Sequence, residues 1–414
     1  MHHLKFEYFI AKRIIDSKAY KSSVSAPIIK IGIAAIAIGI IVMMIAIATG
    51  IGLQQKIREK VVAFNSDIII SNFDSNNSQE SGNPVSMEQD FYPEFKSVEG
   101  VAHIQAVATK FGVIRTETDF EAVILKGVGA DFNWIYFQDF LVKGRVPDYS
   151  GERNEEVLIS QYLANRLQFK LGDSFTTLFR KDDPNKPPSM ITYHIVGIYN
   201  SGFKDFDETY VFGDLRHLQR LNKWEDNQAG HFEVFVTDYS KLNEIYNEVY
   251  NNTPPLLNVT TVEQKFASIF EWIQIFVKNI YGIIGVMILV AGINMITALL
   301  VLVLERTQMI GILKALGSSN WAIRKIFLYN ASYLITLGLL WGNVIGLGLL
   351  FAQKYFKLFP LNPDVYYVTE APVYISLSYI LALNIGTFIL CLAMLLVPSY
   401  IITKISPVKA IRFE

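Results

Sequence analysis

The chain has 414 residues, 51% of them hydrophobic, and a formal net charge of only -1 at pH 7. Its mean hydropathy of +0.29 exceeds what a soluble domain needs to fill its core, and so the composition indicates a membrane protein. The near-neutral charge, with no concentration of Lys and Arg in any one segment of the polar middle region, argues against a nucleic-acid partner, and the single cysteine excludes an intrachain disulfide.

Residues 1–26 are predicted to form an amphipathic helix on the cytoplasmic surface of the membrane. Leu4, Tyr8, Ala11 and Ile15 recur at helical spacing, and basic residues lie between them. A disordered basic leader is the alternative.

Four apolar stretches are long enough to cross a bilayer. The predicted spans are residues 27–53, 273–304, 323–353 and 372–403. The first span is too long and lies too deep in the chain for a cleaved signal peptide, so we expect it to remain as an anchor. Pro372 and Pro398 are expected to trim or kink the ends of the fourth span.

Residues 54–272, between the first two spans, are predicted to form a mixed α/β domain. Alternating or β-branched runs predict strands at residues 67–71, 102–109, 121–128, 175–179, 191–199 and 233–237. Helical patterns are found at residues 161–167, 214–221 and 241–250. Ser240 is the expected N-cap of the last of these helices.

The distribution of Lys and Arg predicts the orientation of the spans. Basic residues outnumber acidic ones in the N-terminal segment, around the loop 305–322 and in the tail 404–414, whereas the short loop 354–371 is balanced. By the positive-inside rule both termini are cytoplasmic, and residues 54–272 and 354–371 are periplasmic. The expected fold is therefore an α-helical membrane protein with four transmembrane helices and a periplasmic α/β domain inserted between helices 1 and 2.

Neither a catalytic site nor a metal site is predicted from the residue pattern. The six histidines are scattered without the spacing of metal ligands, and no GxxxxGK[ST] phosphate loop is present. We therefore expect no enzyme active site and no cofactor in this chain. If ATP and Mg drive it, another chain must bind them.

Residues 305–317, with the sequence ERTQMIGILKALG, are predicted to form a short cytoplasmic helix. Ile310, Leu313 and Leu316 share one helical face, and Gly317 supplies a C-terminal stop. Such a helix fits a groove on a partner, and a helix lying on the bilayer surface is equally compatible with the pattern.

Small residues mark one stripe of the third span. Gly338, Gly342 and Gly346 repeat every fourth residue, which lets another helix approach closely. Asn294 of the second span is similarly interpreted as a helix-to-helix hydrogen bond.

The segment 305–317 resembles the ERTxEIGILKALG pattern of the FtsX-like permeases, the membrane subunits of MacB-type ABC systems. In that family the segment is the coupling helix that docks on the ATPase, which implies this role for Met309, Ile310, Leu313, Lys314, Leu316 and Gly317. Met309 stands where the family usually has an acidic residue. The family's closing pattern PxxxxxxIxPxxALRxE is matched by Pro398, Ile405, Pro407, Ala410, Arg412 and Glu414.

The run from Glu7 to Ser71 resembles the LolC/LolE lipoprotein-releasing branch. It has a span ending in Gly50-Ile-Gly-Leu, a charged helix that continues outward, and Phe64-Asn65-Ser66-Asp67 before a strand. The resemblance implies an inner-membrane subunit that works with a LolD-like ATPase, a second permease subunit in a homodimer or a LolC/LolE heterodimer, acylated lipoproteins and a LolA-like carrier. The alternative is a MacB-like efflux permease or an FtsX-like mechanotransmitting permease with another periplasmic partner.

In LolC-type subunits a loop hooks the carrier LolA, and the matching position here is Arg180 to Met190. The resemblance implies carrier docking through Arg180, Lys181, Pro184, Lys186, Pro187 and Pro188, against the alternative of a solvated hairpin tip. LolE-type subunits contribute more to lipoprotein binding, and the sequence leaves the two types open.

A cavity for the lipid chains is expected between the first and second spans of opposed subunits. The residues expected to line it are Ile40, Met43, Met44, Ile47, Ile283, Val286 and Met287. Ordinary contact of these residues with membrane lipid is the alternative.

Overall fold

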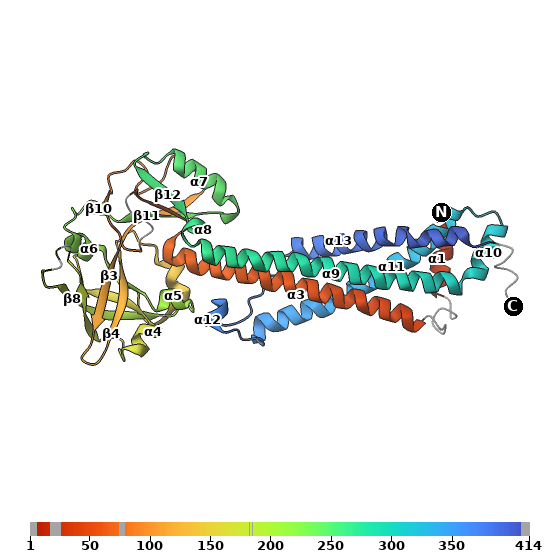
Figure 1. Ribbon diagram of the computed structural model, residues 1–414, viewed down its shortest axis with the longest axis horizontal. Coiled ribbons are helices and arrows are strands. Elements are labelled where there is room, and N and C mark those ends of the chain that lie inside the picture. Colours follow the sequence, from red (N-terminus) through yellow and green to blue (C-terminus); the bar gives the residue numbers. More distant parts are fainter. Residues whose placement is uncertain (1–5, 17–25, 74–78, 182, 184, 407–414) are drawn as a thin grey trace. The chain divides into compact units, whose positions relative to one another are not determined.

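The computed structural model describes residues 6–16, 26–73, 79–181, 183 and 185–406. The chain divides into two compact units (Figure 1). The membrane unit consists of Met1–Gln54, Ile273–Pro360 and Ala371–Glu414, and the α/β unit consists of Gln55–Trp272 and Leu361–Glu370.

Long helices dominate the membrane unit. They are α1 (Phe6–Asp16), α3 (Ala26–Asn65), α9 (Ala267–Glu305), α10 (Thr307–Ala315), α11 (Asn320–Phe356), α13 (Leu377–Leu396) and the 3₁₀ helix η3 (Pro398–Lys404). Four helical segments in the described residues are long and apolar enough to cross a membrane, namely Pro27–Asn65, Ala267–Glu305, Asn320–Phe356 and Leu377–Lys404. The four predicted spans match them, but the fourth begins at Leu377 rather than at residue 372.

The two prolines of the predicted fourth span flank the helix α13. Pro372 precedes α13 in extended chain, and Pro398 stands where the α-helix changes to the 3₁₀ helix η3. A proline in a helix interior would remove one backbone hydrogen bond and clash with the preceding turn. Both prolines therefore lie outside α13.

Helix α3 is longer than a membrane span requires. Its 40 residues correspond to about 60 Å of helix, twice the thickness of the bilayer hydrocarbon. The apolar part is followed without a break by a charged part that ends at Asn65, after which Ser66 adopts a φ of +57° and β1 begins at Ile68. The charged continuation expected from the sequence is confirmed.

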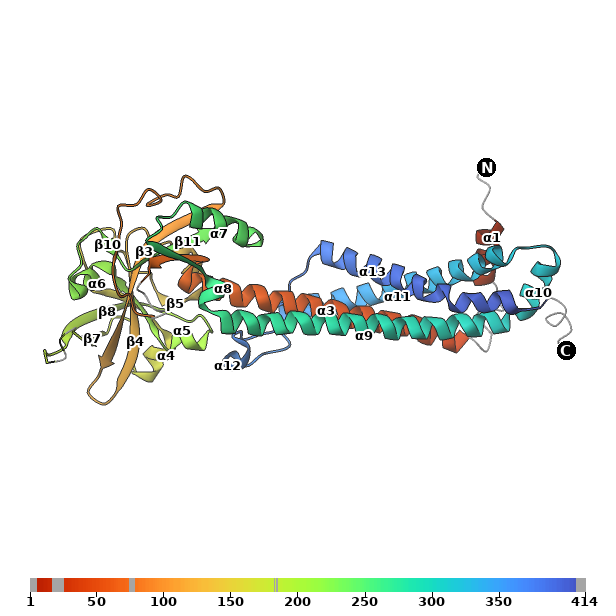
Figure 2. The ribbon, with the colours of Figure 1, turned by 45° about the horizontal axis from the view of Figure 1, so that its top comes forward.

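The helices of the membrane unit share one apolar core. Its fully buried members include Ile36, Ile40 and Met43 of α3 and Ile335 of α11. Helix α1 packs on α11 through Ala11 and Ile14, which contact Ile326. Figures 1 and 2 show α3, α9, α11 and α13 running side by side.

The α/β unit contains twelve strands and several short helices among its described residues. The strands are β1 (Ile68–Asn72), β2 (Val85–Ser86), β3 (Val101–Arg115), β4 (Phe120–Val128), β5 (Leu141–Gly144), β6 (Glu156–Ser160), β7 (Ser174–Phe179), β8 (Ser189–Tyr199), β9 (Tyr210–Asp214), β10 (Gln228–Ala229), β11 (His231–Val236) and β12 (Leu257–Thr261). The helices are η1 (Trp134–Phe140), α4 (Gln161–Arg166), α5 (Lys204–Asp207), α6 (Leu215–Asn222), η2 (Tyr239–Lys241), α7 (Leu242–Asn251), α8 (Val262–Lys265) and α12 (Pro363–Tyr366).

Six strands of the α/β unit close into a ring. The hydrogen-bonded order is β3-β4-β9-β6-β8-β7, and β7 pairs back to β3. Closure removes the exposed sheet edges that would otherwise template aggregation. A flap of β12, β1 and β11 extends from the outer part of β3. In Figures 1 and 2, α7 accompanies the flap, and α4 and α5 lie on the opposite side of the unit.

The ring and the flap have separate apolar cores. Residues such as Val157, Ile159 and Phe179 fill the ring, while Ile70 and Phe232 belong to the core under α7. Strand β3, the longest strand with 15 residues, contributes to both of these cores.

One predicted cap is wrong. Ser240 does not cap α7, because it lies inside the 3₁₀ turn η2. Asp238 is the capping residue of that turn, and its side chain accepts a hydrogen bond from Ser240 N.

The short loop before the fourth span contains a helix and packs with the α/β unit. Residues Leu361–Glu370 belong to the α/β unit and include α12. The ring of Tyr367 stacks on Phe203 at a centroid distance of 4.4 Å, and its carbonyl accepts a hydrogen bond of 2.9 Å from Lys60 Nζ.

Candidate functional site

The short helix α10 is the first candidate site. Gly317 follows it with a φ of +89°, a conformation that favours glycine. Ser318 N donates to Leu313 O at 3.0 Å, and Gly317 N donates to Lys314 O at 3.0 Å. These two bonds form a Schellman ending, and the C-terminal stop expected at Gly317 is confirmed.

The exposed face of α10 differs from the expected one. Ile310 is fully buried in the core of the membrane unit, and Met309 and Leu313 pack against the same core. The exposed apolar side chains are instead Ile312, at 47%, and Leu316, at 77%. The expectation that Ile310 and Leu313 face a partner is therefore corrected, because they hold α10 on its own subunit. The apolar surface left for a partner is formed by Ile312 and Leu316.

Lys314 ties α10 to the last helix of the chain. Its Nζ donates to three backbone carbonyls, those of Ile402 at 2.8 Å, Thr403 at 3.1 Å and Ile405 at 2.8 Å. These carbonyls lie at the C-terminal end of η3, where a cation is also favoured by the helix dipole. Lys314 is thus engaged inside the subunit.

The hairpin of β7 and β8 carries the second candidate site. Phe179 and Ser189 form its last ladder pair. The described residues between them are 180, 181, 183 and 185–188, called the β7–β8 loop below. Lys186 Nζ lies 3.8 Å from Asp183 Oδ2 inside this loop. The side chains of Arg180, Lys181, Lys186, Pro187 and Pro188 are exposed. Pro184 lies outside the described residues.

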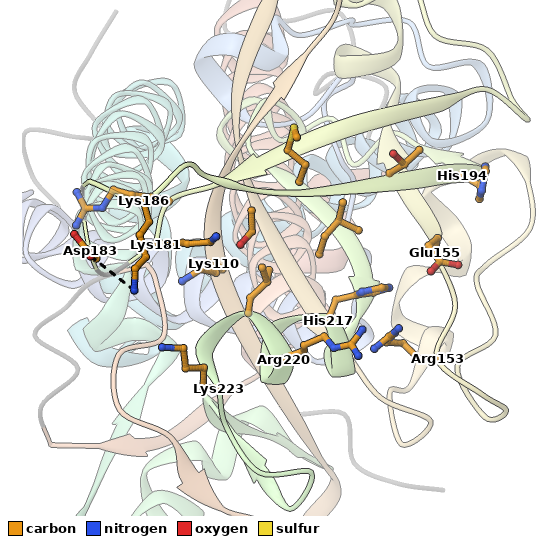
Figure 3. A pocket seen from close by; sticks show the side chains of 16 residues that line it. Lys110, Arg153, Glu155, Lys181, Asp183, Lys186, His194, His217, Arg220 and Lys223 are labelled. Atoms are coloured by element: carbon orange, nitrogen blue, oxygen red, sulfur yellow. Dashed lines mark ion pairs between the residues drawn. The ribbon is translucent and has the colours of Figure 1, made fainter.

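A cavity of about 750 Å³, called the basic cavity below, opens beside the β7–β8 loop (Figure 3). Its walls come from that loop, from β3, from β8, from α6 and from the segment before β6. The lining includes two acidic residues, Glu155 and Asp183. Against these stand seven basic residues, Lys110, Arg153, Arg180, Lys181, Lys186, Arg220 and Lys223. The fold therefore concentrates positive charge that is dispersed along the sequence.

The residues expected to line a lipid cavity separate into two groups. Ile40, Met43 and Met44 of α3 are buried inside the membrane unit, and Ile47 is partly buried. Ile40 and Met44 meet glycines of α11, so these two positions fill a helix interface of the subunit. Met44 and Ile47 also line a small cavity of about 20 Å³ between α3, α11 and α13. On α9, Ile283 and Val286 are exposed, at 38% and 60%, and Met287 is partly buried.

The glycine stripe of α11 lies against α3. A Cβ atom on Gly338 would lie 2.7 Å from Ile36 Cβ, and one on Gly342 would lie 2.8 Å from Ile40 Cβ. At Gly346 the nearest atom is Met44 Sδ, at 3.2 Å. Real Cβ atoms do not approach as closely as the first two distances, so the glycines allow α3 and α11 to touch.

Replacing Gly342 with alanine is expected to destabilise the membrane unit by about 1–3 kcal/mol, because the added methyl group forces the two helices apart. Thermal unfolding of the full chain in detergent measures the loss. Gly348→Ala on the same helix is the matched control, since nothing lies within 4 Å of the added atom there. Equal melting temperatures for the two variants would contradict this interpretation of the stripe.

A polar contact between membrane helices is formed by two asparagines that differ from the predicted one. Asn294 Nδ2 donates to Val290 O of its own helix at 2.9 Å, so its expected role between helices is not observed. Asn343 of α11 and Asn384 of α13 instead exchange two hydrogen bonds of 2.6 and 3.0 Å between their side-chain amides. Sequence alone did not identify this pair, because an asparagine in an apolar run does not reveal its partner.

A buried ion pair at the end of α3 was also missed from sequence. Lys126 Nζ donates to Phe64 O at 2.5 Å and to Glu233 Oε1 at 2.6 Å, and Gln105 Nε2 donates to Glu233 Oε2 at 2.8 Å. The side chains of Lys126 and Glu233 are only 1% and 2% exposed. The ammonium therefore binds the Phe64 carbonyl in the last turn of α3 from inside the sheet.

Burial is the main cause of the pKa shifts of Asp67 and His217 in the α/β unit. Burial raises the pKa of Asp67 to about 6, although the backbone N–H of Val236 donates to it. Burial also lowers the pKa of His217, whose Nε2 lies 2.8 Å from Asn154 O. Among the residues that the structure describes, no three His, Cys, Asp or Glu side chains are grouped to hold a metal ion.

Comparisons with known proteins place the chain in a family. The family model of the MacB-like periplasmic core domain matches residues 31–251, more than half of the chain. The model of the FtsX-like permease C-terminal region matches residues 281–407.

The chain is also similar to curated and solved proteins. It is 22% identical over 264 residues to the lipoprotein-releasing system transmembrane protein LolC of Haemophilus influenzae, a match that covers 63% of this chain and 64% of the relative. It is 22% identical over 396 residues to LolC of Buchnera aphidicola subsp. Schizaphis graminum, with 94% of each chain covered. The crystal structure of the extracellular domain of the noncanonic ABC-type transporter YknZ from Gram-positive bacteria matches with 15% identity and a TM-score of 0.32, over 47% of this chain and 99% of that one.

The extent of these matches differs between relatives. The chain spans slightly less than two thirds of the length of the first curated relatives it matches, 64% and 66%. The two family models together reach from the first apolar helix to the last. The chain therefore belongs to the family with a MacB-like periplasmic core domain, followed by an FtsX-like permease C-terminal region.

Proposed function

We propose that the chain is the transmembrane subunit of a lipoprotein-releasing system, which extracts outer-membrane-directed lipoproteins from the inner membrane and passes them to a LolA-like periplasmic carrier. The observation that carries the proposal is α10, which presents Ile312 and Leu316 in the segment that resembles the coupling pattern of FtsX-like permeases. A LolD-like ATPase, with its ATP and Mg, occupies this surface. The similarity to LolC proteins supports the cargo class.

The proposed topology follows from the basic residues of the cytoplasmic segments. Both termini and α10 face the cytoplasm, and the α/β unit faces the periplasm. This orientation gives α10 access to a soluble ATPase and gives the β7–β8 loop access to a soluble carrier. A second permease subunit, either another copy or a paralogue, completes the transporter.

The energetics of lipid extraction require an apolar path. Moving an acyl chain out of a bilayer into water costs about 0.8 kcal/mol per CH₂ group, so a lipoprotein with two or three chains needs tens of kcal/mol without an apolar acceptor. Ile283 and Val286 of α9, which are exposed, are our candidates for contact with the acyl chains, together with Met287. Closure of the ATPase moves the chains from this surface toward the carrier.

Introducing charge at the α10 surface is expected to uncouple the ATPase. The double variant Ile312→Asp/Leu316→Asp places two carboxylates in an apolar interface, and we expect lipoprotein transfer in a reconstituted system to fall by about tenfold or more. Ser319→Asp is the control, because it adds a carboxylate at an exposed position outside α10, where aspartate can still cap α11. Unchanged transfer by a correctly folded double variant would overturn the coupling role of this face.

A MacB-like efflux permease or an FtsX-like mechanotransmitting permease is the second candidate, favoured by the names of the two matching family models. It would use the same α10 surface but another periplasmic partner. One assay distinguishes the two candidate functions. If the wild-type chain with its ATPase hydrolyses ATP in proteoliposomes and leaves an acylated lipoprotein in the membrane in the presence of carrier, the second candidate is correct.

A further inference from the structure

The basic cavity holds more positive charge than the acidic residues around it neutralise. Lys186 is paired with Asp183, and Lys110 lies 3.2 Å from Glu80 Oε1. No carboxylate among the described residues forms an ion pair with Arg153, Arg220 or Lys223. In a chain whose overall charge is -1, this is a local excess that attracts an anionic partner.

The cations that come from α6 are held on a rigid support. Asp214 caps the helix by accepting a hydrogen bond of 2.9 Å from Arg216 N, and the fully buried Leu218 anchors it in the core of the ring. Lys223 ends the helix in the left-handed conformation, with a φ of +59°. Arg220, one turn earlier, lines the cavity with it (Figure 3). Their backbone positions are therefore set before any partner arrives, which reduces the entropic cost of binding.

The lining of the cavity fits a peptide better than a small anion. Its volume of about 750 Å³ lies within the range of cavities that hold whole ligands. Met190, Ile191 and Leu221 form apolar surface between the cations. A chain segment that alternates carboxylates with apolar side chains would satisfy both kinds of surface, whereas a bare phosphate would leave the apolar part uncovered.

The basic cavity adjoins the β7–β8 loop, the proposed docking site for a soluble carrier. Within the α/β unit, Figures 1 and 2 show β8 and α6 at the end away from α8. One soluble partner can therefore cover both the loop and the cavity.

We propose that the basic cavity binds an acidic segment, rich in Asp and Glu, of the soluble protein that docks on the β7–β8 loop. This proposal rests on the proposed function and adds the chemistry of the partner. The guanidinium groups of Arg153 and Arg220 bind carboxylates in a bidentate manner, and the lysines add charge that steers the encounter. The partner's acidic segment therefore fixes how the carrier is oriented on the loop.

The test measures binding of a fluorescein-labelled peptide of alternating Asp and Leu to the full chain in detergent. The variant Arg153→Glu/Arg220→Glu reverses two cavity charges outside the β7–β8 loop, and we expect it to weaken peptide binding by about tenfold or more. The matched control is Lys143→Glu/Lys241→Glu, which reverses two exposed charges outside the cavity and should change binding less than about twofold. Binding by the wild-type chain should also weaken as salt is raised.

Three outcomes overturn the proposal. One is equal peptide affinity of the two double variants. Another is that Arg153→Glu/Arg220→Glu loses binding to phosphatidylglycerol vesicles but keeps peptide binding, which would assign the cavity to a lipid headgroup. The third is carrier-dependent lipoprotein transfer at the wild-type rate by this variant, which would leave the proposed function standing without the cavity. Cavity-dependent peptide binding without any lipoprotein transfer would instead support the acidic ligand and refute the lipoprotein-releasing function.

Discussion

Replacing Lys126 with methionine is expected to lower the free energy of unfolding of the α/β unit by about 3–5 kcal/mol. Methionine retains most of the volume of the lysine side chain, and so the loss comes from the carboxylate of Glu233, which stays buried without its partner. Urea unfolding of the full chain in detergent measures the change. Tryptophan fluorescence is a suitable signal, because Trp134 lies 6.0 Å from Phe212 in the same aromatic core.

The pH dependence of stability provides a second measurement on the same pair. Burial alone would raise the pKa of Glu233, but the Lys126 ammonium and the adjacent His231 lower it to about 2. Since the carboxyl of an unfolded chain has a pKa of about 4.3, the ionised Glu233 stabilises the fold fully above that pH. This contribution is lost as the pH falls through about 2. We expect wild-type stability to decline more steeply over this range than that of Glu233→Gln.

Two further variants show whether the loss belongs to the pair. Lys126→Met/Glu233→Leu removes both charges and is expected to recover several kcal/mol relative to Lys126→Met, because no unpaired charge remains buried. Lys143→Met, at an exposed position, should stay within about 0.5 kcal/mol of the wild type. A double variant as unstable as the sum of the single changes would contradict the proposed pairing.

The elements that could be predicted from sequence are those in which a local pattern decides the structure. An apolar run of about 20 residues has no alternative to a membrane helix, and all four such runs form long helices. The strand expected at residues 191–199 is β8, Ser189–Tyr199, where polar and apolar residues alternate over the exposed end. The strands β6 and β9 were missed because they are five residues long and buried on both faces, so they show no alternation.

The features that could not be predicted are those created by tertiary packing. The pattern of α10 places Ile310 and Leu316 on one face, but the core of the membrane unit buries the first and leaves the second exposed. The basic cavity gathers Arg153, Lys181 and Arg220 from three distant segments, so its charge is invisible in any window of sequence. A lysine in a strand, such as Lys126, normally indicates a solvated face, and only the fold reveals the acceptor at its end.

Replacing Phe64 with alanine is expected to destabilise the α/β unit by about 3–5 kcal/mol. Phe64 is fully buried near the C-terminal end of α3. Its ring centroid lies between 4.7 and 6.3 Å from those of six other rings, which belong to Phe137, Phe140, Tyr199, Phe206, Tyr210 and Phe212. Alanine would leave a cavity that these rings cannot close, because each also packs against the others or against the sheet.

The matched control for Phe64→Ala is Phe120→Ala at the end of the β3–β4 hairpin, where the side chain is 73% exposed and the loss should stay within about 0.5 kcal/mol.

Lys126 and the aromatic rings around Phe64 contact the end of α3 in different ways. Lys126 donates a hydrogen bond to the Phe64 carbonyl, whereas the aromatic rings hold the Phe64 side chain. Phe64→Leu should therefore loosen the helix end while keeping the Lys126 contact. In the proposed lipoprotein-releasing system, the 40 continuous residues of α3 would link the α/β unit to the membrane helices. We therefore expect Phe64→Leu to reduce transfer by the reconstituted system more than ATP hydrolysis by its ATPase. Equal losses of transfer and hydrolysis would show that the aromatic contacts serve stability alone.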